Sequence, residues 1–201
     1  MKIGVLASGE GTNLQALLDT VHGREVEVVA VASDKPQARA LERAAAAGIA
    51  HRVFERDAYP DRRARDAAIA DWLDEAGVEL VVLAGYMALL DAAFIARFRD
   101  RIVNVHPALL PAFPGVRAIE QALDYGVRVF GVTVHLVDEG VDTGSIILQG
   151  SVDLPGAVDA AEVHEALRPI EHRLLCEAVR LLARGGVRRE SPGARRLVLD
   201  R

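Results

Sequence analysis

The chain has 201 residues, of which 51% are hydrophobic and 26% charged, and its formal net charge is −5. This size and balance are typical of one globular domain with a sizeable core, while the negative charge and sparse aromatic residues argue against a nucleic-acid-binding protein. The single cysteine, Cys176, favours a reducing cytoplasm, and no apolar stretch is long enough for a signal-peptide core or a membrane span.

The first half of the chain alternates between strand-like apolar runs and helix patterns. Strands are expected at residues 2–7, 26–32, 51–54, 79–84 and 101–106. Apolar residues at helical spacing mark three helices between the first four strands, and Gly23, Gly48 and Gly77 stand where glycine commonly ends a helix. This alternation predicts an α/β fold of βαβ units, with a mostly parallel, Rossmann-like sheet flanked by helices.

The second half is expected to differ, because two long apolar runs face each other across a short Gly-rich turn. Residues 128–137 and 145–152 therefore predict an antiparallel hairpin appended to the sheet. Helices are expected at 116–125 and at 159–184, the second with apolar residues along one stripe.

We expect residues 1–185 to form a single domain, followed by a C-terminal tail at 186–201 with no recognisable chemistry. Within the domain, residues 1–100 are expected to form a nucleotide or phosphate half. Residues 101–185 are expected to form the catalytic half.

The loop between the first strand and the first helix, Ser8-Gly-Glu-Gly-Thr-Asn-Leu14, has the features of an anion site. Its glycines let the backbone approach a ligand, and a helix N-terminus offers N–H groups to an anion. Thr12 and Asn13 add side-chain donors. We therefore expect a phosphate here; the structural alternative is a tight turn in which Thr12 is the N-cap.

A second alternative for this loop is a dinucleotide site. Gly9-x-Gly11, followed by Asp34 at the end of the second strand, is similar to the NAD fingerprint with its ribose-binding acid. Leu14 occupies the position of the third glycine, which compromises the close helix–strand approach and the fit of a pyrophosphate. The pattern is therefore weak support for NAD.

The segment Asn104-Val-His-Pro107 ends a strand-like run and enters a proline-rich loop. Asn104 and His106 are two residues apart, so on a strand both side chains point to the same face. Acyl transfer to an amine requires an amide donor for an oxyanion, a proton-carrying base and an acid, such as Asp142, that orients the base or relays a proton. The structural alternative is that Asn104 and His106 satisfy loop backbone groups while Asp142 caps a turn.

The remaining histidines give no sign of a metal site. His164 and His172 are about two turns apart on one predicted helix, too far for a pair of ligands, and no His, Cys or acidic cluster has metal spacing. We therefore expect no metal. His135 lies inside the predicted hairpin, where we expect a packed strand residue rather than a ligand.

Six segments together resemble the phosphoribosylglycinamide formyltransferase family, which is folate-dependent and acts in purine synthesis, from residue 1 to about residue 183. They are SGEGTNLQALLD, LERAAAAGI, VVLAGYMALL, IVNVHPALLPAFPG, GVTVHLVDEGVDTGSIILQ and IEH. The Asn-x-His-Pro-x-Leu-Leu-Pro segment with its partner Asp is shared by a wider group of 10-formyltetrahydrofolate enzymes. The opening Ser-Gly-x-Gly-Thr-Asn is more particular to this family.

The resemblance implies transfer of a formyl group from the cosubstrate 10-formyltetrahydrofolate to the primary amine of glycinamide ribonucleotide. It makes Asn104, His106 and Asp142 the catalytic residues, and implies a cis bond between Leu110 and Pro111. We expect no metal, nucleic-acid or membrane partner, and either a monomer or a homodimer.

The resemblance also assigns binding residues. The ribonucleotide is expected to contact Gly11, Thr12, Asn13 and Glu171. The reduced folate is expected to contact Met87, Ala88, Leu89, Leu90, Asn104, Asp138, Glu139, Gly140, Val141 and Asp142, with Arg62 near its glutamate tail. The positions that depart from the family pattern are Arg117, Arg168, Leu175 and Cys176.

Three other functions remain open from the sequence. A formyltetrahydrofolate hydrolase would use the same three residues, but it is expected to need an N-terminal regulatory domain, whereas here the strand at residue 2 begins the fold. A tRNA formyltransferase is expected to need a basic C-terminal module. A non-catalytic, Rossmann-like nucleotide-binding module would keep the first loop but have no use for Asn104, His106 and Asp142.

Overall fold

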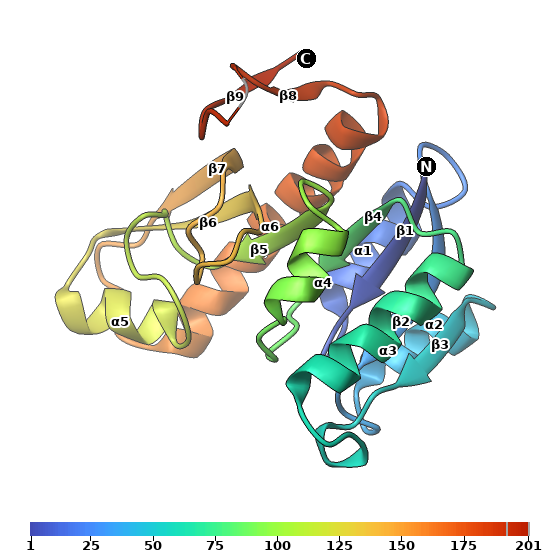
Figure 1. Cartoon of the computed structure of the whole chain (residues 1–201). Coiled ribbons are helices and arrows are strands. Elements are labelled where there is room, and N and C mark those ends of the chain that lie inside the picture. The colour runs from blue at the N-terminus through green and yellow to red at the C-terminus, as the bar shows by residue number, and fades with distance from the viewer. Residues whose placement is uncertain (192, 201) are drawn as a thin grey trace. The chain divides into compact units, whose positions relative to one another are not determined.

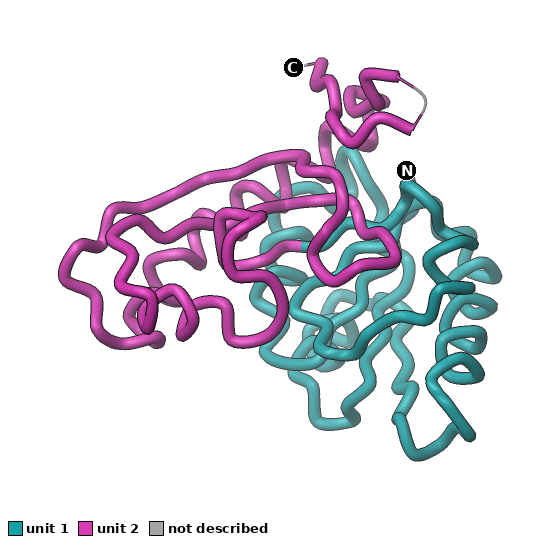
Figure 2. Tube along the Cα trace, turned by 60° about the vertical axis from the view of Figure 1, so that its left-hand side comes forward, with its two compact units in different colours: residues 1–104 teal, residues 105–201 magenta. Residues whose placement is uncertain are grey.

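A computed structural model of the protein describes residues 1–191 and 193–200. The chain divides into two compact units, residues 1–104 and residues 105–201, which are coloured separately in Figure 2. The boundary lies within one strand, between Asn104 and Val105.

Unit 1 alternates strands and helices as the sequence predicts (Figure 1). In chain order its elements are β1 (Lys2–Leu6), α1 (Thr12–Thr20), β2 (Glu27–Ser33), α2 (Arg39–Ala46), β3 (Ala50–Val53), the 3-10 helix η1 (Arg56–Ala58), α3 (Arg62–Glu75), β4 (Leu80–Leu83), α4 (Ala92–Arg97) and the start of β5 (Ile102–His106). The strand order is β3-β2-β1-β4-β5, and the described ladders of this unit are parallel. The prediction of a mostly parallel sheet is therefore confirmed.

The central strands of unit 1 carry apolar side chains on both faces. Every residue of β4 is buried, as are the last four residues of β1, which is the expected pattern for strands covered by helices on both sides. Gly23, Gly48 and Gly77 have φ of 69°, 68° and 73°, so the glycines expected to end helices do adopt the left-handed conformation that favours glycine. The short elements η1 and α4 were not predicted, because three and six residues are too few to show a helical period.

Unit 2 begins with the end of β5 and changes to antiparallel pairing. Its further elements are α5 (Ala118–Tyr125), β6 (Val129–Leu136), β7 (Ile146–Asp153), α6 (Ala160–Ala183), β8 (Val187–Arg189) and β9 (Leu197–Leu199). The strand order is β5-β6-β7, and β6 and β7 form the predicted antiparallel hairpin. Helix α6 packs on both hairpin strands through a buried stripe that includes Val163, Leu167 and Leu174.

Three smaller predictions also have an outcome. Cys176 is buried on α6, which confirms its packing role, and the Leu110–Pro111 bond is cis as expected. The predicted tail contains an antiparallel β8–β9 pair; Pro192 and Arg201 lie outside the described residues. No helix in the described part of the chain is both long and apolar enough to cross a membrane.

Candidate active site

His106 is the last residue of β5, and its side chain is buried at the start of a proline-rich loop. Thr133 of β6 holds this loop in place: its hydroxyl donates to Ala108 O at 2.7 Å and accepts from Leu110 N at 3.0 Å. The amide of Gln149, from β7, donates to both Leu110 O and the Thr133 hydroxyl at 3.0 Å. The hairpin of unit 2 therefore fixes the loop that follows His106.

Asp142 lies in the turn between β6 and β7, in a backbone conformation that is unusual for a residue other than glycine. Its φ is 53°, in the left-handed region that Asp and Asn tolerate better than most residues. The turn is held by Asp138, which accepts hydrogen bonds from Gly140 N at 3.1 Å and from the Thr143 hydroxyl at 2.5 Å. A Cβ atom on Gly144 would lie 1.6 Å from Leu136 O, so only glycine fits there.

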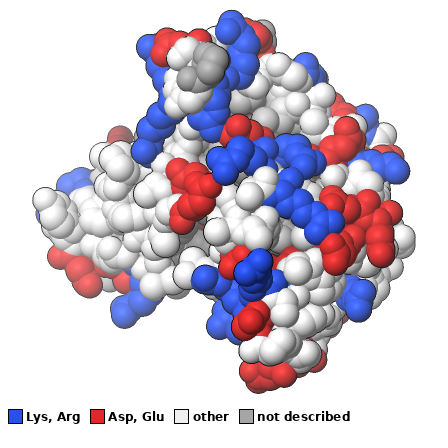
Figure 3. Space-filling model, viewed as in Figure 1, with Lys and Arg blue, Asp and Glu red and all other residues white. Residues whose placement is uncertain are grey.

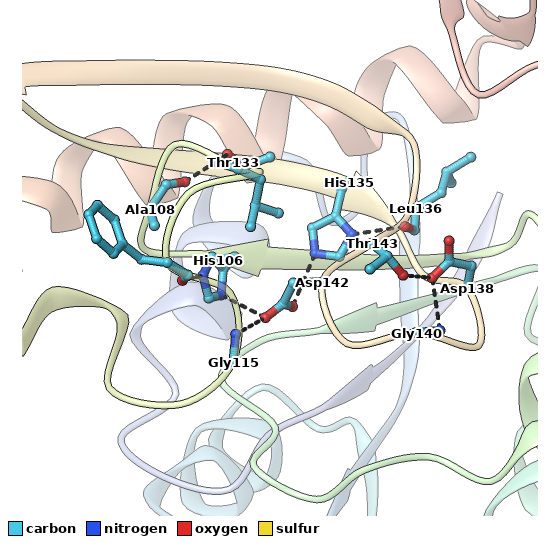
Figure 4. A network of polar contacts seen from close by, with 12 residues as sticks. His106, Ala108, Gly115, Thr133, His135, Leu136, Asp138, Gly140, Asp142 and Thr143 are labelled. Atoms are coloured by element: carbon cyan, nitrogen blue, oxygen red, sulfur yellow. Dashed lines mark hydrogen bonds and ion pairs between the residues drawn. The ribbon is translucent and has the colours of Figure 1, made fainter. Parts of the chain in front are cut away.

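The Asp142 carboxylate lies between two histidines (Figure 4). One carboxylate oxygen is 3.3 Å from Nδ1 of His106 and accepts a hydrogen bond from Gly115 N at 2.7 Å. The other oxygen is 3.5 Å from Nε2 of His135. His106 comes from the end of β5 and His135 from β6, so three separate segments of unit 2 meet at one carboxylate. We call His106, His135 and Asp142 the His–Asp–His cluster.

Each histidine of the His–Asp–His cluster has an acceptor at both ring nitrogens. His106 Nε2 is 2.8 Å from Phe113 O, and His135 Nδ1 is 2.8 Å from Leu136 O, while the opposite nitrogens face Asp142. A neutral imidazole has one donor and one acceptor, whereas an imidazolium has two donors. Each ring therefore has a possible acceptor for a proton on either nitrogen, and one of the two acceptors is the Asp142 carboxylate.

The Asp142 carboxyl itself is held in its charged form. Burial raises the pKa of Asp142, but the hydrogen bonds from His135 and from Gly115 N–H, with the charges of His106 and His135, outweigh burial and set the pKa below its ordinary value. A carboxylate that stays ionised can orient a histidine and stabilise its charge.

The sequence identified two members of this cluster and assigned a different role to the third. His106 and Asp142 lie together as expected, and Asn104 lies two residues before His106 on β5, in unit 1. His135 is 2% exposed, as expected of a packed strand residue, but it also contacts Asp142. The available signal was an ionisable side chain within an apolar strand, because such a group requires a polar partner when buried.

The expected anion loop begins α1 with an unusual cap. Gly11 is the N-cap residue and has φ of 70°, so α1 starts at Thr12 and the alternative with Thr12 as the N-cap is wrong. A Cβ atom on Gly11 would lie 2.7 Å from the Cα of Ala40, so the close approach to α2 requires glycine. The first amides of a helix have no acceptor within the helix, and here those of residues 12–14 follow a glycine-rich loop.

Asp34, the acid of the dinucleotide-like pattern, already has protein partners. It accepts a 2.5 Å hydrogen bond from the Ser8 hydroxyl, and its other oxygen is 3.6 Å from Nε of Arg56. These contacts tie the carboxylate to the β1–α1 loop and to η1. They give Asp34 a structural role that does not require a ribose.

Apart from Asn104 and Arg62, the residues expected to bind folate lie in two segments. Met87, Ala88, Leu89 and Leu90 form the segment between β4 and α4, with Met87 61% and Leu89 60% exposed. Residues 138–142 form the β6–β7 turn described above. Arg62 is exposed at the first turn of α3, whereas Arg65 is 3% exposed.

The last expected substrate contact and the family departures lie on or near helices of unit 2. Glu171 is buried on α6, and Arg168, one turn earlier, pairs with Glu165. Leu175 and Cys176 are buried on the same helix. Arg117 is the N-cap residue of α5.

The described residues offer no metal-binding cluster, and the charges on the drawn face are mixed. In the described residues, no group of three or more His, Cys, Asp or Glu side chains could hold a metal ion. Basic and acidic side chains are interspersed over the face drawn in Figure 3. The expectation of no nucleic-acid partner stays a prediction.

Residues 1–179 match the formyl transferase family. A phosphoribosylglycinamide formyltransferase of Mycobacterium tuberculosis is 44% identical over 187 residues, which cover 92% of this chain and 86% of that protein. The trifunctional purine biosynthetic protein adenosine-3 of Drosophila pseudoobscura is 42% identical over 194 residues, which are 94% of this chain but only 14% of that protein. The chain therefore spans a small part of such multifunctional relatives.

Solved structures of similarly named enzymes also resemble this chain. Glycinamide ribonucleotide transformylase 1 from Symbiobacterium toebii has a TM-score of 0.93 and 46% identity, with 100% of this chain and 94% of that chain covered. The phosphoribosylglycinamide formyltransferase from Anaplasma phagocytophilum has a TM-score of 0.92 and 32% identity, with 100% and 95% covered.

Proposed function

Because the chain belongs to the formyl transferase family, we propose that it transfers the formyl group of 10-formyltetrahydrofolate to the primary amine of glycinamide ribonucleotide, in de novo purine biosynthesis. The names of its relatives support this substrate pair. The observation that carries the proposal is the contact between His106, the last residue of β5, and Asp142. Nδ1 of His106 lies 3.3 Å from a carboxylate oxygen of Asp142. Formyl transfer to an amine needs such a pair, because one proton must leave the attacking nitrogen and another must reach the leaving group.

In the proposed reaction the amine of glycinamide ribonucleotide attacks the formyl carbon directly. A tetrahedral intermediate forms. Its oxyanion accepts a hydrogen bond from the Asn104 amide and is stabilised by the charge of His106. Asp142 assists transfer of a proton from the attacking nitrogen to N10 of the folate. The bond between the formyl carbon and N10 then breaks, giving formylglycinamide ribonucleotide and tetrahydrofolate.

His106 has to change one contact to donate directly to the oxyanion. Its Nε2 lies 2.8 Å from Phe113 O, and its Nδ1 faces Asp142. The Nε2 proton must therefore be shared between Phe113 O and the oxyanion, or exchanged from one to the other. This requirement connects the conformation of the 107–115 loop to the chemical step.

The substrates are assigned to the residues that suit their chemistry. We place the ribonucleotide phosphate at Gly11, Thr12 and Asn13, where a helix N-terminus favours an anion, and we assign a further ribonucleotide contact to Glu171. The apolar side chains of Met87 and Leu89, with Ala88 and Leu90, suit the flat pteridine and benzoyl rings of a folate. The remaining proposed folate contacts are Asn104, Asp138, Glu139, Gly140, Val141 and Asp142, with Arg62 at the glutamate tail.

One assay tests the proposal. Purified protein is mixed with 10-formyltetrahydrofolate, and tetrahydrofolate formation is measured with and without glycinamide ribonucleotide, while formylglycinamide ribonucleotide is followed by mass spectrometry. We expect turnover only with the ribonucleotide, and one formylated product for each tetrahydrofolate. Equal turnover without it, with formate as product, would indicate a hydrolase, and no turnover would indicate a nucleotide-binding module.

We further propose that the protein acts in the cytoplasm as a monomer or homodimer. The single, buried cysteine suits a reducing compartment. Sedimentation of the purified protein measures its oligomeric state.

A further inference from the structure

The segment between β4 and α4 presents apolar side chains, and its backbone is hydrogen-bonded to side chains of other parts of unit 1. Met87 is 61% and Leu89 60% exposed, whereas Ala88 between them is 7% exposed. We call residues 87–90 the ledge. Two neighbouring exposed apolar side chains are useful for recognition only if their backbone is fixed, because otherwise binding must also order the segment.

The end of the ledge is held by Arg65 and Asp66, two neighbouring residues of α3. Arg65 donates to one Asp66 oxygen from Nε at 2.9 Å and from a terminal nitrogen at 2.7 Å, and the same terminal nitrogen is 3.3 Å from Leu89 O. The other Asp66 oxygen accepts from Asp91 N at 2.6 Å. One buried ion pair therefore contacts the backbone at Leu89 and again two residues later.

The start of the ledge is held by Ser8. Its hydroxyl accepts from Met87 N at 2.9 Å and donates to Asp34, while its own N–H donates to Gly85 O at 3.1 Å. The ledge is thus bonded at both ends to side chains of other elements of unit 1. Ser8 also opens the loop that leads to the proposed phosphate site, so its contacts serve two loops at once.

The Arg65–Asp66 pair is a poor device for stability alone. The two side chains are 3% and 1% exposed, and removing two charges from water often offsets their mutual attraction. Burial raises the pKa of Asp66 above its ordinary value despite hydrogen bonds from Arg65 and from Asp91 N–H. A neighbouring link between α3 and α4 is made at the surface, where Arg97 bonds Asp71 and Asp74. Joining the two helices therefore does not require a buried pair.

We propose that Arg65 and Asp66 are positioning residues that fix the ledge for the folate cosubstrate; this inference rests on the proposed function. The planar guanidinium bonds a carboxylate and a carbonyl at the same time, which a lysine cannot do in the same geometry. The pair thereby sets the backbone from Leu89 to Asp91 and the outward direction of the Met87 and Leu89 side chains. It contributes to folate recognition without touching the folate.

Arg65→Lys is the sharpest test, because it keeps the charge beside Asp66 and removes the fork that reaches Leu89 O. We expect KM for 10-formyltetrahydrofolate to rise roughly fivefold to tenfold, the worth of about one hydrogen bond, with kcat and KM for the ribonucleotide within about twofold of wild type. The matched control is Arg97→Lys, which weakens the exposed link between the same two helices. It should leave both KM values unchanged.

Hydrogen exchange supplies a readout that needs no substrate. In Arg65→Lys, and in Asp66→Glu as a second variant that keeps both charges, the peptide covering residues 85–91 should exchange faster while β1 and β4 keep their protection. Unchanged exchange at 85–91, or an equal rise in both KM values, overturns the inference. A wild-type protein that transfers no formyl group refutes the proposed function instead, and leaves the exchange result to decide whether the pair positions the ledge.

Discussion

The buried polar residues of unit 1 and of unit 2 do different things. Around the ledge, Ser8, Arg65 and Asp66 bond mainly to backbone groups or to each other, so that they hold a shape. In the His–Asp–His cluster, two histidine side chains face one carboxylate. The comparison teaches that burial of a charged group does not by itself mark chemistry. A carboxylate that is paired with an arginine and bonded to the ledge backbone suits positioning, whereas a carboxylate between two histidines suits proton transfer.

The largest effect is expected at Asp142, where the proposed proton transfer can be removed without changing shape. Asp142→Asn should lower kcat by roughly 10²–10⁴, the usual worth of a positioned acid–base group, and leave both KM values near wild type. Asparagine can cap a turn about as well as aspartate, so a purely structural Asp142 predicts no loss. Steady-state kinetics with both substrates decide between these roles. Asp124→Asn, on the exposed side of α5, is the control for loss of one negative charge.

His135 tests whether the cluster extends beyond the residues that the sequence identified. His135→Phe keeps a ring of similar size in β6 but removes the contacts with Asp142 and Leu136 O. Loss of a hydrogen bond to a charged group is expected to reduce kcat about tenfold to hundredfold, less than the change at Asp142. Unfolding in urea shows whether the hairpin is intact. A folded variant with wild-type kcat would show that His135 serves packing alone.

Asn13 tests the anion loop of unit 1, where binding rather than rate should change. Asn13→Asp places a negative charge at the N-terminus of α1, so KM for the ribonucleotide is expected to rise about tenfold while KM for the folate stays constant. Gln15→Glu adds the same charge in the second half of the first turn and serves as a control for net charge. Equal increases in both KM values in Asn13→Asp would remove the phosphate from this loop.

The smallest effect is on the pH dependence of stability, where Asp142 and Asp66 are expected to act in opposite directions. The pKa of Asp142 is lowered on folding, so its contribution to stability is present above its unfolded pKa of about 4 and is lost as pH falls through the folded pKa. The pKa of Asp66 is raised, so its contribution is present below about pH 4 and is lost as pH rises through the folded pKa. The free energy of unfolding, measured with urea between about pH 3 and pH 7, should therefore decrease less steeply toward acid pH for Asp142→Asn than for wild type. A steeper fall would contradict the direction of the Asp142 shift.

The longer helices and the strands of the central sheet could be predicted from the sequence because their signals are local. Apolar runs of strand length alternate with helical periods, and the glycines at 23, 48 and 77 stand at helix ends, so strand direction and connection follow from chain order. The two-residue spacing of Asn104 and His106, the following prolines and the Gly-rich turn around Asp142 indicated a site at the end of β5. Strand periodicity and turn chemistry need no knowledge of distant residues.

Only the tertiary structure showed which distant side chains contact the same carboxylate or the same backbone segment. The contact of His135 with Asp142 depends on the register of β6 against β7 and on the left-handed turn at Asp142, and neither is encoded in the spacing of two residues. The contact of Arg65 with Leu89 O joins positions 24 residues apart. In the sequence, Arg62, Arg63 and Arg65 are alike; burial against Asp66 distinguishes Arg65, because a charged group can leave water only where a partner compensates it.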